Sequence, residues 1–216
     1  MDGGSGAPVA FVGYGALGRQ LEGLLLATGA GPLQAVFDDP AAAAGHRGAH
    51  PFDVYADPAF ADHAFVVALG YRHLARKAAI VDELRSAGRR LLSLVHPTAF
   101  VHPEACLGEG VVVYPMANID QGVEVASGVL LNNSVVLSHE TRVGAASYLS
   151  PGVVTSGRVE VGAQVFLGSR VTIANDLHVG DGAVVGVGSV VTRDLPAGAH
   201  ALGNPARIRD RPLRLA

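Results

Sequence analysis

Residues 95–124 read VHPTAF VHPEAC LGEGVV VYPMAN IDQGVE, and the first residue of each group of six is aliphatic. The same spacing continues to Val191 with Thr155 as its one polar member. A helix repeats every 3.6 residues and a strand every two, so neither alone gives a period of six. Hexad repeats are typical of a parallel β-helix, in which short strands are joined by tight corners. The series is Val95, Val101, Leu107, Val113, Ile119, Val125, Leu131, Leu137, Val143, Leu149, Thr155, Val161, Leu167, Ile173, Val179, Val185 and Val191.

Three hexads per coil would build a triangular prism whose interior is filled by the repeated aliphatic residue. A second small or β-branched residue follows four positions later in most hexads, as at Ala99, Ala105 and Val111. Glycine, asparagine and aspartate tolerate positive φ, so we expect them to form the corners. The expected corner residues are Asn132, Asn133, Gly144, Gly152, Gly162, Gly168, Asn175, Asp176 and Gly180.

The part of the chain before the repeats follows another pattern, in which apolar runs alternate with segments of helical spacing. We expect a strand over 8–13, a glycine-rich turn over 13–18, a helix over 19–28 and a strand over 33–37, followed by Asp38. This order of strand, turn, helix and strand indicates the start of a parallel α/β sheet.

Loops or a short strand are expected over 41–57, a third strand over 64–69, a helix over 72–88 and a fourth strand over 90–95. His96-Pro97 marks the junction with the repeats. The predicted fold is therefore a small Rossmann-like α/β domain over residues 1–94, followed over 95–216 by a parallel β-helix with a short C-terminal tail.

The turn Gly13-Tyr14-Gly15-Ala16-Leu17-Gly18 has the spacing of a loop that holds a phosphate at a helix N-terminus. Asp38 lies about 20 residues past Gly18, the distance at which a carboxylate can accept a hydrogen bond from a ribose hydroxyl. A unit of about 90 residues is one mononucleotide-binding half. This favours a single nucleotide over NAD and disfavours an NAD oxidoreductase. Glycines that only permit tight helix packing, and a non-enzymatic nucleotide-binding protein, remain open.

His139 is the candidate catalytic residue of the repeats. With three hexads per coil, it stacks beneath Gly157 and then Asn175. A corner histidine cannot enter the narrow core, and the neighbouring Glu140 could fix its tautomer. The Gly157 N–H, one coil away, could hold an oxyanion. A general base with an oxyanion donor fits acyl transfer from a thioester, whereas a solvated surface histidine is the alternative.

Composition excludes several classes of function. The 216 residues carry a net charge of −3 and are 16% charged, so neither nucleic acid nor an anionic membrane is an expected partner. The single Cys106 rules out an intrachain disulfide and suits a reducing cytoplasm. We expect no signal peptide and no membrane span.

A three-histidine zinc site is another alternative. The repeats contain His96, His102, His139 and His178. His139 and His178 are not separated by a whole number of hexads, so they are neither stacked nor neighbouring, and no metal is expected.

The hexad repeat resembles the left-handed β-helix acyltransferases. With its N-terminal α/β domain, the chain is similar to the sialic acid O-acetyltransferase-like family and its nucleotide-linked amino-sugar N-acetyltransferases. The segment 132–140, NNSVVLSHE, matches the family's catalytic segment, with His139 as base and Glu140 as its supporting acid. Gly157 matches the glycine whose N–H binds the thioester carbonyl. The segment 203–207, GNPAR, matches the C-terminal signature near the coenzyme's adenosine.

The resemblance implies transfer of an acetyl group from acetyl-CoA to the amine or hydroxyl of a nucleotide-linked sugar, in bacterial glycan or secondary-metabolite biosynthesis. A sugar O-acetyltransferase acting on a free sugar such as a sialic acid is the alternative. The flat faces of the prism predict a homotrimer with each active site between two chains, and the composition suits a cytoplasmic location. The implied substrate-binding residues are Gly13, Tyr14, Gly15, Asp38, Gly70, Tyr71 and Arg72. The implied coenzyme-binding residues are Asn132, Tyr148, Gly157, Asn175, Gly203, Pro205 and Arg207.

Three positions depart from the family pattern. Leu17 and Tyr148 stand where the family often has histidine, and Tyr71 follows Gly70 where it often has Asn or Asp. None falls on the base or the oxyanion donor, so these departures bear on the acceptor sugar and its nucleotide more than on the reaction. Tyr71 could stack on a base, and Arg72 could meet a phosphate.

Overall fold

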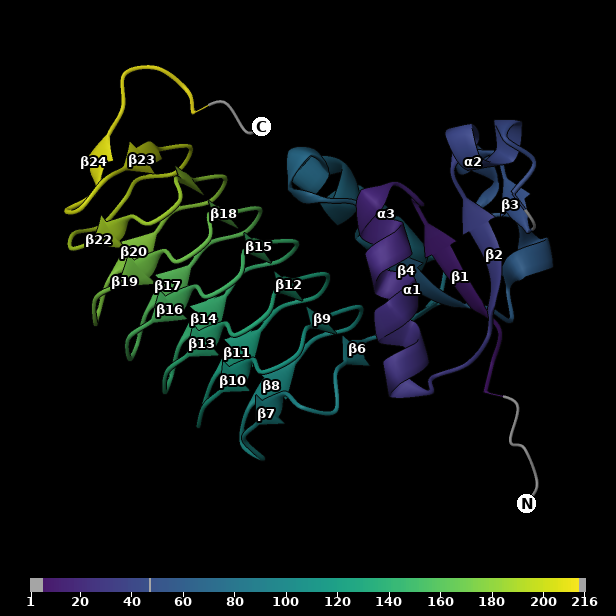
Figure 1. Cartoon of the computed structure of the whole chain (residues 1–216), viewed down its shortest axis with the longest axis horizontal. Coiled ribbons are helices and arrows are strands. Elements are labelled where there is room, and N and C mark those ends of the chain that lie inside the picture. Colours follow the sequence, from purple (N-terminus) through teal and green to yellow (C-terminus); the bar gives the residue numbers. More distant parts are fainter. Residues whose placement is uncertain (1–5, 47, 214–216) are drawn as a thin grey trace.

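The structure is a computed structural model that describes residues 6–46 and 48–213. A parallel sheet with helices on both sides forms the N-terminal part, and a β-solenoid forms the rest (Figure 1). No helix among the described residues is long and apolar enough to cross a bilayer.

The N-terminal sheet has the strand order β3-β2-β1-β4-β5, and all of its pairs are parallel. Its strands are β1 (Val9–Val12), β2 (Leu33–Phe37), β3 (Ala49–His50), β4 (Ala64–Val67) and β5 (Arg90–Leu91). The helices are α1 (Ala16–Thr28), α2 (Asp39–Ala43) and α3 (Leu74–Ser86), with 3₁₀ turns at Phe52–Val54, Pro58–Phe60 and Tyr71–His73. The predicted strand–turn–helix–strand unit is present as β1, α1 and β2.

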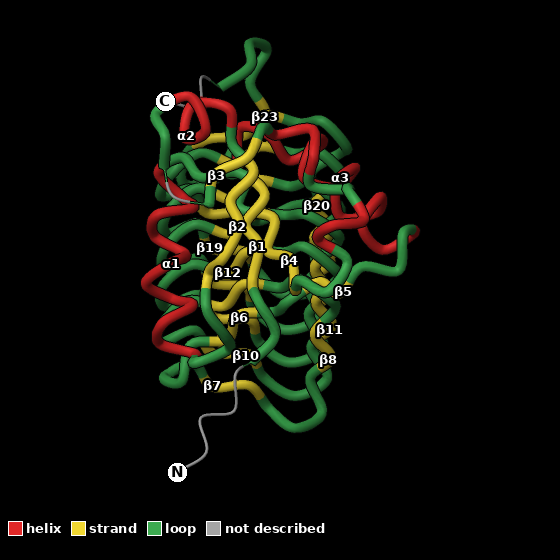
Figure 2. The backbone as a smooth tube through the Cα atoms, turned by 90° about the vertical axis from the view of Figure 1, so that its right-hand side faces the viewer, coloured by secondary structure: helices red, strands yellow, loops and turns green. Residues whose placement is uncertain are grey.

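Helices α1 and α3 cover opposite faces of this sheet (Figure 2). Alternate strand residues explain this arrangement: Val9 and Phe11 pack with α1, whereas Ala10 and Val12 pack with α3. Helix α3 also touches the solenoid. Its Val81 lies against Gly128, and its Arg85 pairs with Glu109 at 3.0 Å.

The solenoid consists mainly of two-residue strands that form three sheets. The first sheet contains β6 (Leu94–Val95), β9 (Val112–Val113), β12 (Leu130–Leu131), β15 (Tyr148–Leu149), β18 (Phe166–Leu167), β21 (Val184–Val185), β23 (His200–Leu202) and the antiparallel β24 (Arg207–Ile208). The second contains β7 (Phe100–Val101), β10 (Asn118–Ile119), β13 (Val136–Leu137), β16 (Val154–Thr155), β19 (Thr172–Ile173) and β22 (Val190–Val191). The third contains β8 (Cys106–Leu107), β11 (Glu124–Val125), β14 (Arg142–Val143), β17 (Glu160–Val161) and β20 (His178–Val179).

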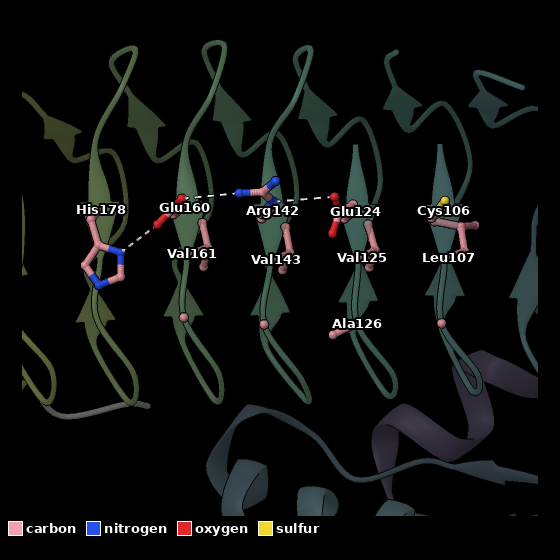
Figure 3. A pocket seen from close by; sticks show the side chains of 13 residues that line it. Cys106, Leu107, Glu124, Val125, Ala126, Arg142, Val143, Glu160, Val161 and His178 are labelled. Atoms are coloured by element: carbon pink, nitrogen blue, oxygen red, sulfur yellow. Dashed lines mark ion pairs between the residues drawn. The ribbon is translucent and has the colours of Figure 1, made fainter. Parts of the chain in front are cut away.

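The outward residue of each strand gives every sheet a distinct surface. On the first sheet Leu130, Tyr148 and Phe166 are buried against the N-terminal part, and we call it the docked face. The outward residues of the second sheet are largely apolar and partly exposed, and we call it the apolar face; they are Phe100, Asn118, Val136, Val154, Thr172 and Val190. The third, the charged face, carries a line of polar side chains: Cys106, Glu124, Arg142, Glu160 and His178 (Figure 3).

The predicted period of six is confirmed. Leu137 pairs with Thr155 and Thr155 with Ile173, so each coil contains three hexads. The repeated residues fill one continuous interior, almost entirely buried from Val113 onwards. The fourth predicted strand is divided, because Arg90–Leu91 joins the N-terminal sheet whereas Leu94–Val95 begins the solenoid.

The expected corner residues do lie between the strands of the solenoid, but the prediction that they adopt positive φ was largely wrong. Of the nine expected, only Gly152 and Asp176 have positive φ. Positive φ occurs at the third residue after most of the inward ones, including non-glycine residues such as Glu140 at 58° and Arg158 at 55°. Gly162 and Gly168 serve another purpose: a Cβ there would lie 2.7 Å from a backbone nitrogen of the next coil, so the coil spacing requires glycine.

Candidate active site

His139 lies at the corner between the apolar and charged faces, shortly after β13. Its side chain is 45% exposed, and its Nδ1 lies 3.2 Å from Oε2 of Glu140. If Nδ1 carries the proton, the Nδ1–H donates a hydrogen bond to that carboxylate, and Nε2 is left as a free acceptor. The imidazole is thus oriented by its neighbour and open to a ligand from outside the coil.

Gly157 occupies the same corner one coil further on, and its small size makes room for the imidazole. A Cβ on Gly157 would collide with Nε2 and Cε1 of His139. Gly157 is buried and has no positive φ, so the ring's position explains the glycine and backbone conformation does not. Its carbonyl accepts a hydrogen bond from Asp176 N at 3.1 Å. Its N–H donates to no backbone or side-chain acceptor within the described residues.

Two further charged groups lie at this corner. Arg158 binds Asp176 through Nε at 2.6 Å and through Nη2 at 3.0 Å. The hydrogen bond from Arg158 holds the pKa of Asp176 below its usual value, and the Coulomb field of His139 acts in the same direction. Neither residue was assigned to the site from the sequence, although counting one coil from Glu140 leads to Arg158 and a second coil leads to Asp176.

Thr155, the polar exception in the aliphatic series, is explained inside the coil. Its hydroxyl lies 3.2 Å from that of Thr141, and both side chains are fully buried. Thr141 Oγ1 donates its one proton to the Ser156 carbonyl at 3.2 Å, so the Thr155 hydroxyl is the donor in the pair. The two hydroxyls therefore satisfy each other just beneath the corner that holds His139 and Gly157.

The glycine-rich turn borders a second candidate site, a cavity of about 400 Å³ that we call the turn cavity. Six of the seven implied substrate-binding residues line it: Gly13, Gly15, Asp38, Gly70, Tyr71 and Arg72. Tyr14 does not, because its hydroxyl donates to Glu22 at 2.6 Å and its ring packs on His46. Helices α1 and α3 begin at this cavity without a side-chain cap, so their positive ends suit an anion.

Asp38 has a structural task that the sequence did not reveal. Its Oδ2 accepts the Tyr14 N–H at 2.8 Å, and its Oδ1 accepts the Ala41 N–H at 3.0 Å. The carboxylate thereby ties the glycine-rich turn to the start of α2. Each oxygen keeps one lone pair for a ligand, so a hydrogen bond to a ribose hydroxyl remains compatible with this geometry.

An aromatic cluster closes the turn cavity on the side of the solenoid. The Tyr71 ring lies 4.8 Å from Phe166 and 5.5 Å from Tyr148, measured between centroids. The Tyr148 hydroxyl accepts a hydrogen bond from Asn132 Nδ2 at 3.3 Å, and burial raises its pKa. Phe166 was not identified from the sequence; its outward place on the docked face, one coil beyond Tyr148, would have indicated it.

The implied coenzyme-binding residues do not come together within one chain. Tyr148 and Asn132 lie at the docked face, while Gly157 and Asn175 lie at the corner between the apolar and charged faces. Gly203, Pro205 and the exposed Arg207 belong to the hairpin of β23 and β24. The solenoid therefore stands between the turn cavity and His139 of the same chain.

The histidines considered for zinc are placed separately. His139 pairs with Glu140 and His178 lies 3.6 Å from Glu160, whereas Nδ1 of His96 contacts Thr98. In the part of the chain that the structure describes, no three His, Cys, Asp or Glu side chains are grouped so that they could hold a metal ion.

No protein-family model matches the chain. A point variant of perosamine N-acetyltransferase from Caulobacter crescentus, solved with CoA and GDP-perosamine, is 29% identical, with a TM-score of 0.85 over 95% of this chain and 98% of that one.

Two other solved structures share the fold at lower identity. The acetyltransferase domain of PglB from Neisseria gonorrhoeae is 24% identical, with a TM-score of 0.82 over 94% of this chain and 100% of that one. It has also been solved with acetyl coenzyme A. WeeI from Acinetobacter baumannii is 20% identical, with a TM-score of 0.60 over 94% and 100% of the two chains. The predicted resemblance to hexapeptide-repeat acyltransferases of nucleotide-linked amino sugars is confirmed by these structural neighbours.

Proposed function

We propose that this protein is an acetyltransferase that moves an acetyl group from acetyl-CoA to the amine of a nucleotide-linked amino sugar. The observation that carries the proposal is the placement of His139 Nε2 over Gly157 with Glu140 on Nδ1. The perosamine N-acetyltransferase of similar fold, which binds CoA and GDP-perosamine, supports the choice of substrates. On the same grounds, the solenoid is proposed to be a left-handed β-helix, as expected from the resemblance to hexapeptide-repeat acyltransferases.

In the proposed reaction His139 is the general base. Its Nε2 takes a proton from the acceptor amine as the nitrogen lone pair forms a bond to the thioester carbonyl carbon. The N–H of Gly157 donates a hydrogen bond to the carbonyl oxygen as it becomes negatively charged. The C–S bond then breaks, and the CoA sulfur leaves with the bonding electrons and recovers the proton from His139. Glu140 stabilises the imidazolium in between.

The N-terminal part, residues 1–94, is proposed as a Rossmann-like domain that binds the nucleotide. Its turn cavity carries the glycine-rich turn, two uncapped helix N-termini and the Arg72 guanidinium, which together suit a diphosphate. Tyr71, packed against the aromatic cluster, would stack on the base or the sugar. Residues 95–216 are proposed as the acyltransferase domain.

A homotrimer is proposed because one chain cannot complete the site. The turn cavity lies at the docked face, and His139 lies at the opposite edge of the prism. The apolar face, which in one chain exposes Val136, Val154 and 53% of the Phe100 surface, is the proposed contact between copies. The sugar of a nucleotide held in the turn cavity of one chain would then reach His139 of the next chain. Tyr148 and Asn132, which lie beside that cavity, would contribute to the same shared site.

The direct test is acetyl transfer by His139→Ala and His139→Asn. We expect kcat to fall by about 10² to 10⁴, the usual contribution of a general base, with melting temperatures close to that of the parent protein. Transfer within tenfold of the parent rate would refute the role of His139. Assays with amino-sugar and hydroxy-sugar nucleotides, and with free sialic acid, separate N-acetylation from the O-acetyltransferase alternative.

The shared site is tested by mixing two inactive variants. Gly15→Leu fills the turn cavity without backbone strain, because Gly15 has φ −67°, and without a clash, because no atom lies within 4 Å of the added Cβ. His139→Ala removes the base. If sites form between chains, trimers reassembled from equal amounts should recover about one quarter of full activity, since each site then needs an intact group from each of two chains. No recovery in verified mixed trimers would place the whole site within one chain.

A further inference from the structure

Three charged residues follow one another along the corner beside His139. Glu140, Arg158 and Asp176 occupy the same position of successive coils, with φ of 58°, 55° and 62°. Because β13, β16 and β19 are neighbouring strands, their backbones are about 4.8 Å apart. Arg158 therefore has one carboxylate on each side, Glu140 one coil below and Asp176 one coil above.

The guanidinium binds only one of these partners. Both of its bonds go to Asp176, at 2.6 and 3.0 Å, while Glu140 is paired with His139 Nδ1 at 3.2 Å. The four groups still act on one another through space, since Glu140 acts electrostatically on Arg158 and His139 on Asp176. The corner thus holds two bonded pairs, His139–Glu140 and Arg158–Asp176, and Glu140 and Arg158 are neighbours that do not bond to each other.

We propose that Asp176 is a positioning residue, which holds the Arg158 guanidinium away from Glu140 so that this carboxylate remains the partner of His139. A guanidinium binds a carboxylate more strongly than a neutral imidazole N–H does, because both partners are charged and the contact is bidentate. Without Asp176, Arg158 turns to Glu140. The imidazole then loses the acceptor that fixes its proton on Nδ1.

If the Arg158–Asp176 pair only stabilised the fold, its loss would affect stability and not the imidazole of His139. Ion pairs between exposed side chains also run along the charged face, where Arg142 lies 3.5 Å from Glu124 and 3.6 Å from Glu160 (Figure 3). If the Arg158–Asp176 pair only connected coils, its loss would have the same effect on the protein as the loss of the Arg142 ion pairs on the charged face. The backbone bonds Arg158 N to His139 O and Asp176 N to Gly157 O already join these coils. Side-chain changes therefore leave the coil connection in place.

The inference rests on the proposed function only for its effect on the rate, and three variants test it. Asp176→Asn keeps the shape and suits positive φ. Arg158→Gln is tolerated sterically, since Gln164 has φ 55° at an equivalent corner. We expect Asp176→Asn to lower kcat about fivefold, the upper range for an exposed pair, with both KM values within twofold. Arg158→Gln and the double variant should stay within twofold of the parent, because neither contains a competing guanidinium.

The control is Glu124→Gln on the charged face, which should leave kcat and KM unchanged. The second readout is the ¹⁵N spectrum of the His139 imidazole, recorded without substrate at a pH where the ring is neutral. We expect a dominant Nδ1–H tautomer in the parent and in the double variant, and a mixture of tautomers in Asp176→Asn. An unchanged tautomer in Asp176→Asn, or a double variant as slow as Asp176→Asn, overturns the inference. Activity that survives His139→Ala would refute the proposed function instead. The ¹⁵N spectrum would still test whether Asp176 controls the tautomer of His139.

Discussion

The substitution Gly157→Ala tests the contact between two coils on which the proposed site depends. The new Cβ would overlap Nε2 and Cε1 of His139 and would lie 3.1 Å from Cδ2. Carbon atoms rest about 3.5–4.0 Å apart, so the imidazole must move by about 1 Å or more. Displacement of a catalytic group by about 1 Å can reduce the rate about 10²-fold. We expect kcat to fall by about that factor.

The fold should tolerate this change. The ring that gives way is half exposed, and Gly157 does not have positive φ, so alanine fits its backbone and stabilises by restricting the unfolded chain. Thermal unfolding should show a melting temperature equal to or slightly above that of the parent protein. The backbone N–H is retained, so the loss of rate reports the displaced ring and not a missing oxyanion donor.

The matched control is Gly23→Ala in α1, a glycine whose added Cβ meets no atom within 4 Å. It should leave kcat unchanged. In the His139→Ala background, Gly157→Ala should cost nothing further, because the ring it displaces is gone. Retention of kcat within threefold in Gly157→Ala, or a full 10²-fold loss on top of His139→Ala, would contradict the reasoning.

Three further predictions concern groups buried or bonded elsewhere. Lys77 is fully buried with no hydrogen-bond partner for Nζ, and burial lowers its pKa from 10.5 to about 8. Between about pH 8 and 10.5 the unfolded chain therefore binds this proton and the folded chain does not, so the free energy of unfolding should rise with pH over that range. Lys77→Met should remove this rise and stabilise the protein by about 3 kcal/mol at pH 7, measured by urea unfolding at several pH values; equal pH profiles would contradict it. Asp38→Asn should weaken nucleotide binding more than tenfold in calorimetry and cost about 1–3 kcal/mol of stability, since one backbone N–H then loses its acceptor; unchanged affinity and stability would disprove this role. Thr155→Val should cost about 1 kcal/mol by leaving the hydroxyl of Thr141 with one partner fewer, and an unaltered unfolding midpoint would show that the hydroxyl pair is dispensable.

The solenoid was predictable because its interior admits only one kind of residue at one spacing. Once each coil has three hexads, the stacking of Gly157 on His139 follows from counting. The outward residues also carry information about packing: Tyr148 and Phe166 follow each other on one sheet, whereas Glu124 and Arg142 follow each other on another. A column of buried aromatic residues such as Tyr148 and Phe166 thus marks the face on which the N-terminal part packs, whereas the apolar face is left for the proposed contact between copies.

The corners could not be interpreted in the same way, because glycine has two different reasons to be there. At Gly152 it provides positive φ, while at Gly168 it leaves room for the backbone of the next coil. Composition alone does not separate these causes. The division of the strand over 90–95 was missed for a similar reason, since Leu91 and Leu94 are both apolar and buried although they belong to different sheets.

The fixed coil length also limits how such a chain can change its length. Inserting a single hexad between Glu140 and Gly157 would turn every later hexad by one face of the prism, and the imidazole would then stack on an unrelated residue. Inserting a whole coil there would restore the faces yet separate the two groups by an extra layer. Beyond Asp176, in contrast, whole coils can be gained or lost while the corner keeps its composition. Related chains of unequal length should therefore differ by multiples of one coil, placed after this corner.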